Sequence, residues 1–272
     1  MAPINKITRT AHHISTNGDL SARLNLATTD DEVGRLANTF DIMLARLDDA
    51  FQRERRFTAD ASHELRTPLT TMRTILGTML SQKRSTVEYE EALADLAEET
   101  DRMRDLTQGL LSLARNDDAS TPKTDETVDL SKLLHDISEP FEELANEKGL
   151  SLTRYIPENL ALTGDGDALV GLFSNLLANA IKYTPQGKIN LSARSTDKGI
   201  EVTVADTGIG IAPDDTPHIF ERFYRVDKSR STPGTGLGLA IAHDAVLAHR
   251  GRLSVESELG QGTTFNVWLP FS

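Results

Sequence analysis

The chain has 272 residues, of which 38% are hydrophobic, and this predicts a globular protein of about two domains. A formal net charge of -12 argues against general binding to nucleic acid or to anionic membrane surfaces. The absence of cysteine excludes disulfides, thiolate nucleophiles and cysteine metal sites, and no apolar run reaches the roughly 18 residues of a spanning helix, so the sequence as given is expected to be soluble.

The first 50 residues carry two short helical patterns. Apolar residues from Ile4 to Ile14 are three or four positions apart, which is the seam of a coiled-coil helix that ends at Asn17-Gly18. A second helix is predicted to begin at Asp31-Glu32. Its seam consists of Val33, Leu36, Phe40, Met43 and Leu47. Because two such seams cannot both be buried within one chain, association with a second copy is expected.

A helical hairpin is expected over residues 51–116. Helical periodicity continues to Leu80 without a breaker, and after the polar turn at 81–86 a third helix repeats leucine and methionine in heptads. Two such hairpins side by side would form an antiparallel four-helix bundle with a continuous core. Residues 117–125 lack periodicity and are predicted to be a linker.

Residues 126–272 have the pattern of a mixed α/β domain. Helices are predicted at 131–148, 166–182 and 236–250, and strands at 188–195, 199–205, 252–257 and 263–269. The economical packing of these elements is an α/β sandwich, with a mixed sheet covered on one face by helices. The chain is therefore expected to be multidomain, with an all-α coiled coil and four-helix-bundle dimer followed by an α/β sandwich.

Asn175, Asn179 and Lys182 lie on one line of the predicted helix 166–182, opposite its apolar side. Asparagine is a poor residue for the middle of a helix, so two on one line indicate either a solvated face or a functional one. In the functional interpretation an amide oxygen binds Mg²⁺, which prefers oxygen ligands, while the lysine reaches a phosphate.

Two glycine-rich segments follow this helix. In DTGIG, at 206–210, the backbone can approach a flat ligand and Asp206 can accept a hydrogen bond from an exocyclic amine, although a plain turn explains the segment equally well. GTGLGL, at 234–239, opens a helix whose amides suit a phosphate chain, but it has neither the lysine of a P-loop nor a preceding strand. The basic segment at 219–231 is interpreted as a mobile lid over phosphates.

The stretches NLLANAIKYTP, DTGIG, IFERFYR and GTGLGL occur in this order, and residues 126–272 thereby resemble the catalytic ATP-binding domain of sensor histidine kinases. The four stretches look like the N, G1, F and G2 boxes of that family. The resemblance implies that Asn179 chelates Mg²⁺ and that Arg225, for which Arg222 competes, contacts a phosphate. The other ATP-binding residues that it implies are Asn175, Lys182, Tyr183, Asp206, Gly208, Gly210, Gly234, Gly236, Gly238 and Thr264.

The stretch FTADASHELRTPLT, at 57–70, resembles the H box of the same family. His63 lies off the apolar stripe of its helix and is expected to be exposed, as an inert surface histidine would also be. The resemblance implies that His63 accepts the phosphoryl group, that Glu64 is the general base and that Thr67 positions water when a phosphorylated partner is dephosphorylated. Pro68 is expected to bend the helix just after this turn.

Residues 1–50 look like a HAMP signal-relay module, so the resemblance covers nearly the whole chain. It implies the cytoplasmic part of a bacterial inner-membrane receptor whose membrane spans precede residue 1. The implied activity is autophosphorylation of His63 from Mg-ATP by a homodimer, followed by transfer to an aspartate of a response regulator receiver domain. Two alternatives stay open. One is an ATP hydrolase of the same nucleotide fold, in which a glutamate would occupy the position of Asn175, and the other is a non-catalytic scaffold that binds nucleotide as a switch.

Overall fold

The computed structural model describes residues 9, 12, 16, 32–117, 126–226 and 234–271. Of the predicted first helix only Arg9, His12 and Thr16 are described, and all three are helical. Residues 118–125 of the predicted linker and residues 227–231 of the basic segment lie outside the described part. The chain divides into two compact units, Met1–Glu64 and Leu65–Ser272.

Helix α2 (Glu32–Ser81) begins at the predicted acidic pair and continues without interruption to the predicted turn. Within the first unit it buries Ala37 and Leu44, which are 1% and 2% exposed. Three members of the predicted seam are instead exposed in the single chain, namely Leu36, Met43 and Leu47. The expected second copy that would cover this seam stays a prediction.

In the second unit the remainder of α2 and helix α3 (Thr86–Asp117) form the predicted hairpin. Thr100 Oγ1 of α3 lies 3.8 Å from Met72 Sδ of α2. A capping box fixes the start of α3, because Ser85 Oγ accepts from the Glu88 N–H at 3.3 Å while Glu88 Oε2 accepts from the Ser85 N–H at 2.8 Å.

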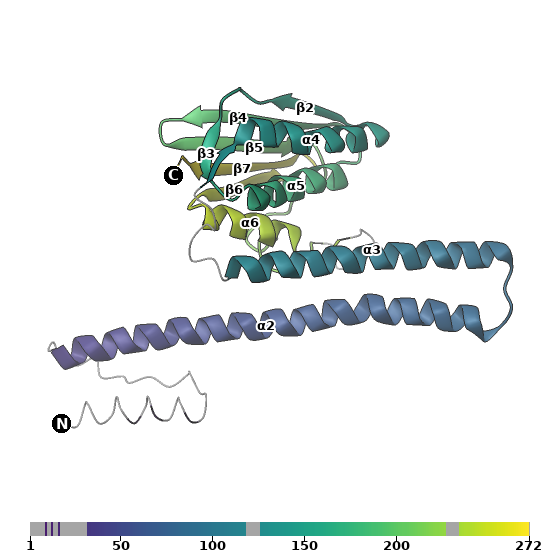
Figure 1. Cartoon of the computed structure of the whole chain (residues 1–272), viewed down its shortest axis with the longest axis horizontal. Helices are drawn as coiled ribbons and strands as arrows, with labels where there is room; N and C mark the ends of the chain where they lie inside the picture. Colours follow the sequence, from purple (N-terminus) through teal and green to yellow (C-terminus); the bar gives the residue numbers. More distant parts are fainter. Residues whose placement is uncertain are drawn as a thin grey trace. The chain divides into compact units, whose positions relative to one another are not determined.

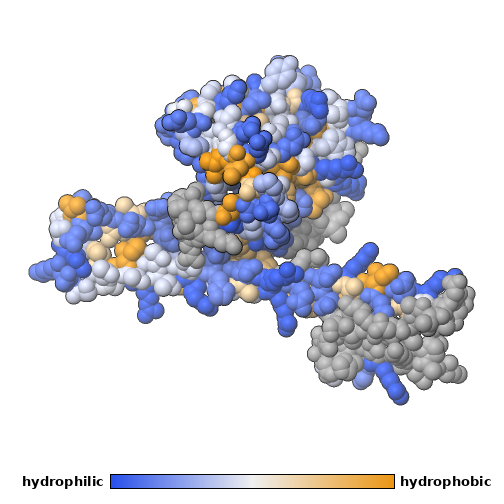
Figure 2. Space-filling model, turned by 180° about the vertical axis from the view of Figure 1, so that it is seen from behind, coloured by the Kyte–Doolittle hydropathy of each residue, from blue (hydrophilic) through white to orange (hydrophobic). Residues whose placement is uncertain are grey.

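Apolar side chains remain exposed along these long helices. In Figure 2 orange patches interrupt their hydrophilic surface. Leu80, Leu93 and Leu111 are 84%, 64% and 61% exposed, whereas Leu106 and Leu113 are buried. Such a stripe offers a face for packing against further helices. None of the helices that the structure describes is both long and apolar enough to cross a membrane.

The C-terminal domain contains a mixed sheet, as predicted (Figure 1). The order of its five strands is β2-β4-β5-β7-β6, with β2 parallel to β4 and the other neighbours antiparallel. These strands are β2 (Ser151–Tyr155), β4 (Lys188–Thr196), β5 (Gly199–Asp206), β6 (Arg252–Glu258) and β7 (Gly262–Pro270). A separate pair joins β1 (Glu126–Asp129) to β3 (Ala161–Gly164).

Helices α4 (Leu130–Glu147), α5 (Gly166–Tyr183) and α6 (Gly238–Ala248) cover one face of the sheet (Figure 1). Asp129 and Asp165 start α4 and α5, since each side chain accepts a hydrogen bond from a backbone N–H of the first turn. The core lies between these helices and the sheet, where Phe173 of α5 is fully buried. The predicted α/β sandwich is thereby confirmed.

Strands β1, β2 and β3 were not predicted from the sequence. They have 4, 5 and 4 residues, which are too few for a clear alternation of apolar and polar side chains. Helix α6 is shorter than the predicted range 236–250, because it begins at the third glycine of its motif, Gly238. The later start leaves Gly234 and Gly236 in the loop that precedes the helix.

Candidate active site

Helix α5 carries Asn175, Asn179 and Lys182, which are all half-buried. The opposite side of this helix, centred on Phe173 and Leu176, is fully buried in the core. Burial of the apolar side fixes the rotation of α5 about its axis, so the asparagines and the lysine are presented together at the edge of the core.

The N-terminus of α6 lies against Asn175. Asn175 Nδ2 donates to Gly171 O at 2.8 Å, and a Cβ atom at Gly238 would lie only 2.6 Å from Asn175 Oδ1. A side chain at position 238 would therefore displace the Asn175 side chain. The first N–H groups of α6 have no partner within the helix, and their place beside Asn175 suits a phosphate chain.

Lys182 lies between the end of α5 and the glycine-rich loop. Its Nζ is 4.8 Å from the centroid of the Tyr183 ring, and a Cβ atom at Gly234 would lie 2.5 Å from the same Nζ. Gly236 has a φ of 70° and accepts a hydrogen bond from the Phe223 N–H at 2.9 Å. A side chain at Gly236 would be strained and would also meet the Phe223 backbone at 2.7 Å. The loop thus contacts both Lys182 and the predicted F box.

Asp206 stands at the end of β5, where its Oδ1 accepts from the Gly208 N–H at 2.8 Å and from the Thr263 N–H at 3.3 Å. Among the described residues its Oδ2 has no hydrogen-bond partner, so this oxygen is available to an exocyclic amine. Burial raises the pKa of the Asp206 carboxyl above its ordinary value of 3.8, while the two backbone hydrogen bonds oppose the rise.

The loop after β5 packs closely on its neighbours. A Cβ atom at Gly208 would collide with Tyr183 O and lie 2.8 Å from Asp206 Oδ1. Gly210 has a φ of 68°, and a Cβ atom there would collide with Glu258 O. Tyr183, Asp206 and both glycines of the motif therefore meet at one close-packed loop, where the absence of side chains lets the backbone come close to a flat ring such as adenine.

The structure corrects the assignment of Thr264 to the ATP site. Side chains alternate along β7, so Thr263, Phe265 and Val267 are buried toward the helices, whereas Thr264 faces the other side of the sheet. Thr263 is 6% exposed and its N–H contacts Asp206, so Thr263 is the threonine of this site. The sequence could have indicated Thr263, because this residue lies two positions from the core residue Phe265 and therefore on the same face of the strand.

The predicted F box is attached to α6 by two contacts. A guanidinium nitrogen of Arg222 lies 3.1 Å from Asp244 Oδ2, and the Phe220 ring stacks on the His243 ring with centroids 5.2 Å apart. Sequence reasoning missed His243 and Asp244, because nothing in the pattern of α6 marks them. Arg222 therefore contacts α6, and the phosphate contact implied for Arg225 stays a prediction.

The donor set fits ATP and Mg²⁺. The Asn179 amide has no hydrogen-bond partner among the described residues, so its oxygen can serve a metal ion. Mg²⁺ keeps several waters and takes further ligands from substrate phosphates, and therefore needs few protein oxygens. The described residues include no cluster of three acidic or histidine side chains that could hold a metal without a nucleotide.

His63 is exposed on α2, as predicted, and Glu64 and Thr67 are half-buried. His63 and Glu64 belong to the first compact unit, whereas Thr67 and the buried Pro68 belong to the second. The roles implied for His63, Glu64 and Thr67, and the bend expected at Pro68, stay predictions.

Asp206→Asn is expected to weaken nucleotide binding at pH 7 without destabilising the free domain. A carboxyl whose pKa is raised by folding contributes stability below its unfolded pKa and loses it as the pH rises through the folded pKa. The neutral amide avoids this loss, so the Tm of the variant at pH 7 should equal or exceed that of the wild type. Loss of a charged acceptor should weaken binding of a fluorescent ATP analogue by about 10- to 100-fold. A lowered Tm with unchanged binding would contradict this interpretation.

Three family models match successive parts of the chain. Residues 1–49 match the HAMP domain, residues 53–119 match the His Kinase A (phospho-acceptor) domain, and residues 164–272 match the histidine kinase-, DNA gyrase B-, and HSP90-like ATPase. Sensor histidine kinase CusS of Escherichia coli O6:H1 (strain CFT073) is 38% identical over 272 residues, which cover 99% of this chain and 56% of CusS. The chain thus spans little more than half the length of this curated relative.

Solved structures of histidine kinases share the fold. The Acinetobacter baumannii histidine kinase AdeS has a TM-score of 0.62 at 22% identity, and the alignment covers 77% of this chain and 98% of AdeS. Histidine kinase ThkA, solved in complex with the response regulator protein TrrA, has a TM-score of 0.64 at 20% identity. The alignment covers 84% of this chain and 66% of the matched chain. At these identities the likeness shows the fold alone.

Proposed function

Since this chain belongs to the sensor histidine kinases of bacterial two-component signalling, we propose that it transfers the γ-phosphoryl group of Mg-ATP to His63. The observation that supports this most directly is the grouping of Asn175, Lys182 and the loop glycines around the N-terminus of α6. ATP binding agrees with the ATPase family that residues 164–272 match. The exposure of His63 leaves its ring accessible to a nucleotide-bearing domain.

Some residues of the chain bind the nucleotide, and others take part in the phosphoryl transfer. Asp206 accepts a hydrogen bond from the amine of the adenine, and Lys182 and Arg225 contact phosphates. The Asn179 oxygen would hold Mg²⁺, which when bound neutralises phosphate charge. His63 accepts the phosphoryl group on one imidazole nitrogen, and Glu64 holds the proton on the other. Phosphoryl transfer depends mostly on position and charge, so these few contacts are sufficient.

The proposal includes a homodimer and a response regulator as partners. The exposed leucines of the hairpin, such as Leu80 and Leu93, support packing of two hairpins into a four-helix bundle. ThkA, which has a similar fold, was solved in complex with a response regulator protein. This complex supports the proposal that His63 passes its phosphoryl group on to a receiver aspartate. We place the chain as the cytoplasmic portion of an inner-membrane receptor, in agreement with the HAMP match over residues 1–49.

Incubation with γ-labelled ATP and Mg²⁺ tests this function against its two alternatives. Kinase activity predicts protein-bound label that is labile in acid and stable in base, as a phosphoramidate is. Free phosphate without labelled protein would instead support an ATP hydrolase, and nucleotide binding with neither product would support a scaffold. Asn175 occupies the position where a hydrolase places its general base, so we expect the labelled protein.

Thr67→Ala is expected to preserve labelling of His63 but to slow dephosphorylation of the regulator by about tenfold or more, because water is no longer positioned for attack. Purified phosphorylated regulator, incubated with each variant and ADP, gives the rate directly. Thr74→Ala is the matched control, since this exposed threonine lies farther along α2 and its hydroxyl donates to Thr70 O at 2.9 Å, within the same helix. Equal dephosphorylation rates for the two variants would remove the role of Thr67.

A further inference from the structure

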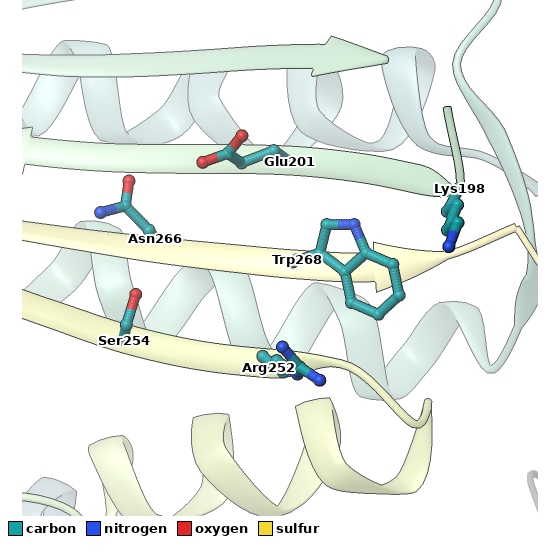
Figure 3. Close-up of a pocket in the computed structure, with 6 residues that line it drawn as sticks. All are labelled: Lys198, Glu201, Arg252, Ser254, Asn266 and Trp268. Carbon is teal, nitrogen blue, oxygen red and sulfur yellow. The ribbon is translucent and has the colours of Figure 1, made fainter. Parts of the chain in front are cut away.

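A hollow lies on the sheet face opposite the three helices (Figure 3). It is lined by Lys198, Glu201, Arg252, Ser254, Asn266 and Trp268. The strand register explains its shape, because Arg252, Trp268 and Glu201 are direct neighbours across β6, β7 and β5. The next row contains the shorter Ser254 and Asn266, and these leave a depression beside the indole. Its volume of about 500 Å³ lies within the range of about 300–1,000 Å³ for small-molecule sites.

This hollow is separate from the nucleotide site. Glu201 and Asp206 lie five positions apart on β5, so their side chains point to opposite faces of the sheet. At about 3.4 Å per residue, these positions are also about 17 Å apart along the strand. A ligand in the hollow would therefore touch none of the residues that we assign to ATP.

The polar groups around the hollow are mostly hydrogen-bond donors. Thr203 Oγ1 donates to Asn266 Oδ1 at 2.9 Å, so one lone pair of this oxygen is already used. Glu201 is neutralised by Arg194, whose Nε donates to Glu201 Oε2 at 2.7 Å. The surroundings therefore favour a ligand that accepts hydrogen bonds and carries negative charge.

Two cations and one aromatic ring stand at the same end of the hollow. In Figure 3 the Trp268 indole lies between Lys198 and Arg252. Neither cation has an ion-pair or hydrogen-bond partner within the described part of the chain. Lys198 and Arg252 are exposed, as cations on the wet face of a sheet usually are, whereas the half-buried indole between them gives this face an aromatic surface that solvation does not require.

We propose that this hollow binds a small aromatic anion, with its ring stacked on Trp268 and its phosphate or carboxylate at an edge of the indole, where Lys198 and Arg252 stand. The flat indole matches the ring, and the two cations match the charge. The site accommodates one small molecule, whereas a stable protein partner would need about 1,200–2,000 Å² of buried surface. This proposal does not depend on the phosphotransfer reaction.

Phenyl phosphate is the probe, because it combines one ring with one phosphate. Trp268 is the only tryptophan of the chain, so its indole N–H gives a single NMR signal that reports directly on the hollow. Titration of the full chain should shift this signal saturably, and inorganic phosphate or phenol alone should shift it far less. The absence of a saturable shift up to about 10 mM probe would overturn the proposal, because any binding would then be weaker than about 3 kcal/mol. An equal response to inorganic phosphate would overturn the requirement for a ring.

Substitutions then locate the site. Lys198→Gln combined with Arg252→Gln should weaken probe binding at least tenfold at an unchanged Tm. Lys188→Gln, an exposed cation at the far end of β4, is the matched control and should bind as the wild type does. Asp206→Asn should also bind the probe normally, and loss of binding there would assign the signal to the nucleotide site. Stronger binding of tetraglutamate than of phenyl phosphate would instead identify a surface for acidic protein segments.

Discussion

Replacing His63 by glutamine is expected to abolish the acid-labile label completely while leaving nucleotide affinity unchanged. Glutamine is a good helix former and is polar, but it has no nitrogen that can attack phosphorus. His63 is exposed, and substitutions at such positions usually change stability by no more than about 0.5 kcal/mol. Label is measured after acid and base treatment, and nucleotide affinity with a fluorescent ATP analogue.

His12→Gln is the matched control for this experiment. His12 is likewise an exposed, helical histidine in the first compact unit, but no catalytic role is implied for it. This variant should be labelled as strongly as the wild type. Wild-type labelling of His63→Gln would show that another residue accepts the phosphoryl group, and loss of label in His12→Gln would point to a general effect on the N-terminal unit.

The parts of the fold that could be predicted are those in which one segment carries its own periodic signal. Helix α5 is an example, because its buried side and its asparagine line follow directly from 3.6-residue periodicity. The long strands β4, β5 and β7 were predicted for the same reason, since each shows several cycles of alternation. The assignment of Thr264 was wrong by one position, and in a strand a shift of one position moves a side chain to the other face of the sheet.

The remaining features depend on contacts between distant segments. His249 is buried, its Nε2 accepts from the Asp165 N–H at 2.9 Å, and its Nδ1 donates to Ala245 O at 2.7 Å. It thereby links the end of α6 to the start of α5, although 84 positions separate His249 from Asp165. The Arg222–Asp244 pair joins the F box to α6 in the same way. No local pattern marks such residues, because each has a role only after the helices have packed.

The hollow beside Trp268 was missed for a different reason. Five of its side chains occupy ordinary outward positions on their strands and Lys198 lies in the turn before β5, so only the register of β5, β7 and β6 brings them together. Antiparallel pairing of β5 with β7 cannot be deduced from either strand alone, since both have a buried and a wet face. Sites built across strands therefore appear only once the topology is known.

Asn179→Ala is expected to reduce labelling of His63 by about 10²-fold or more, because charge neutralisation by a bound metal ion contributes several kcal/mol to transfer. Alanine is a better helix former than asparagine, so α5 should not be weakened. Asn146→Ala, a change at an exposed asparagine of α4, is the matched control and should be labelled normally. Wild-type labelling of Asn179→Ala would mean that the metal ligand is another residue.

Mixing the two inactive variants then shows which chain phosphorylates which. In a mixed dimer the His63→Gln chain has an intact nucleotide site, whereas the Asn179→Ala chain has an intact histidine. Transfer between chains would restore label on the Asn179→Ala chain, because each variant supplies what the other lacks. Transfer within one chain would leave the mixture unlabelled, since neither chain then holds both groups. In such a mixed dimer the intact nucleotide site and the intact histidine belong to different chains. Restored label would therefore also show that Asn179→Ala leaves the fold around His63 intact and impairs the nucleotide site.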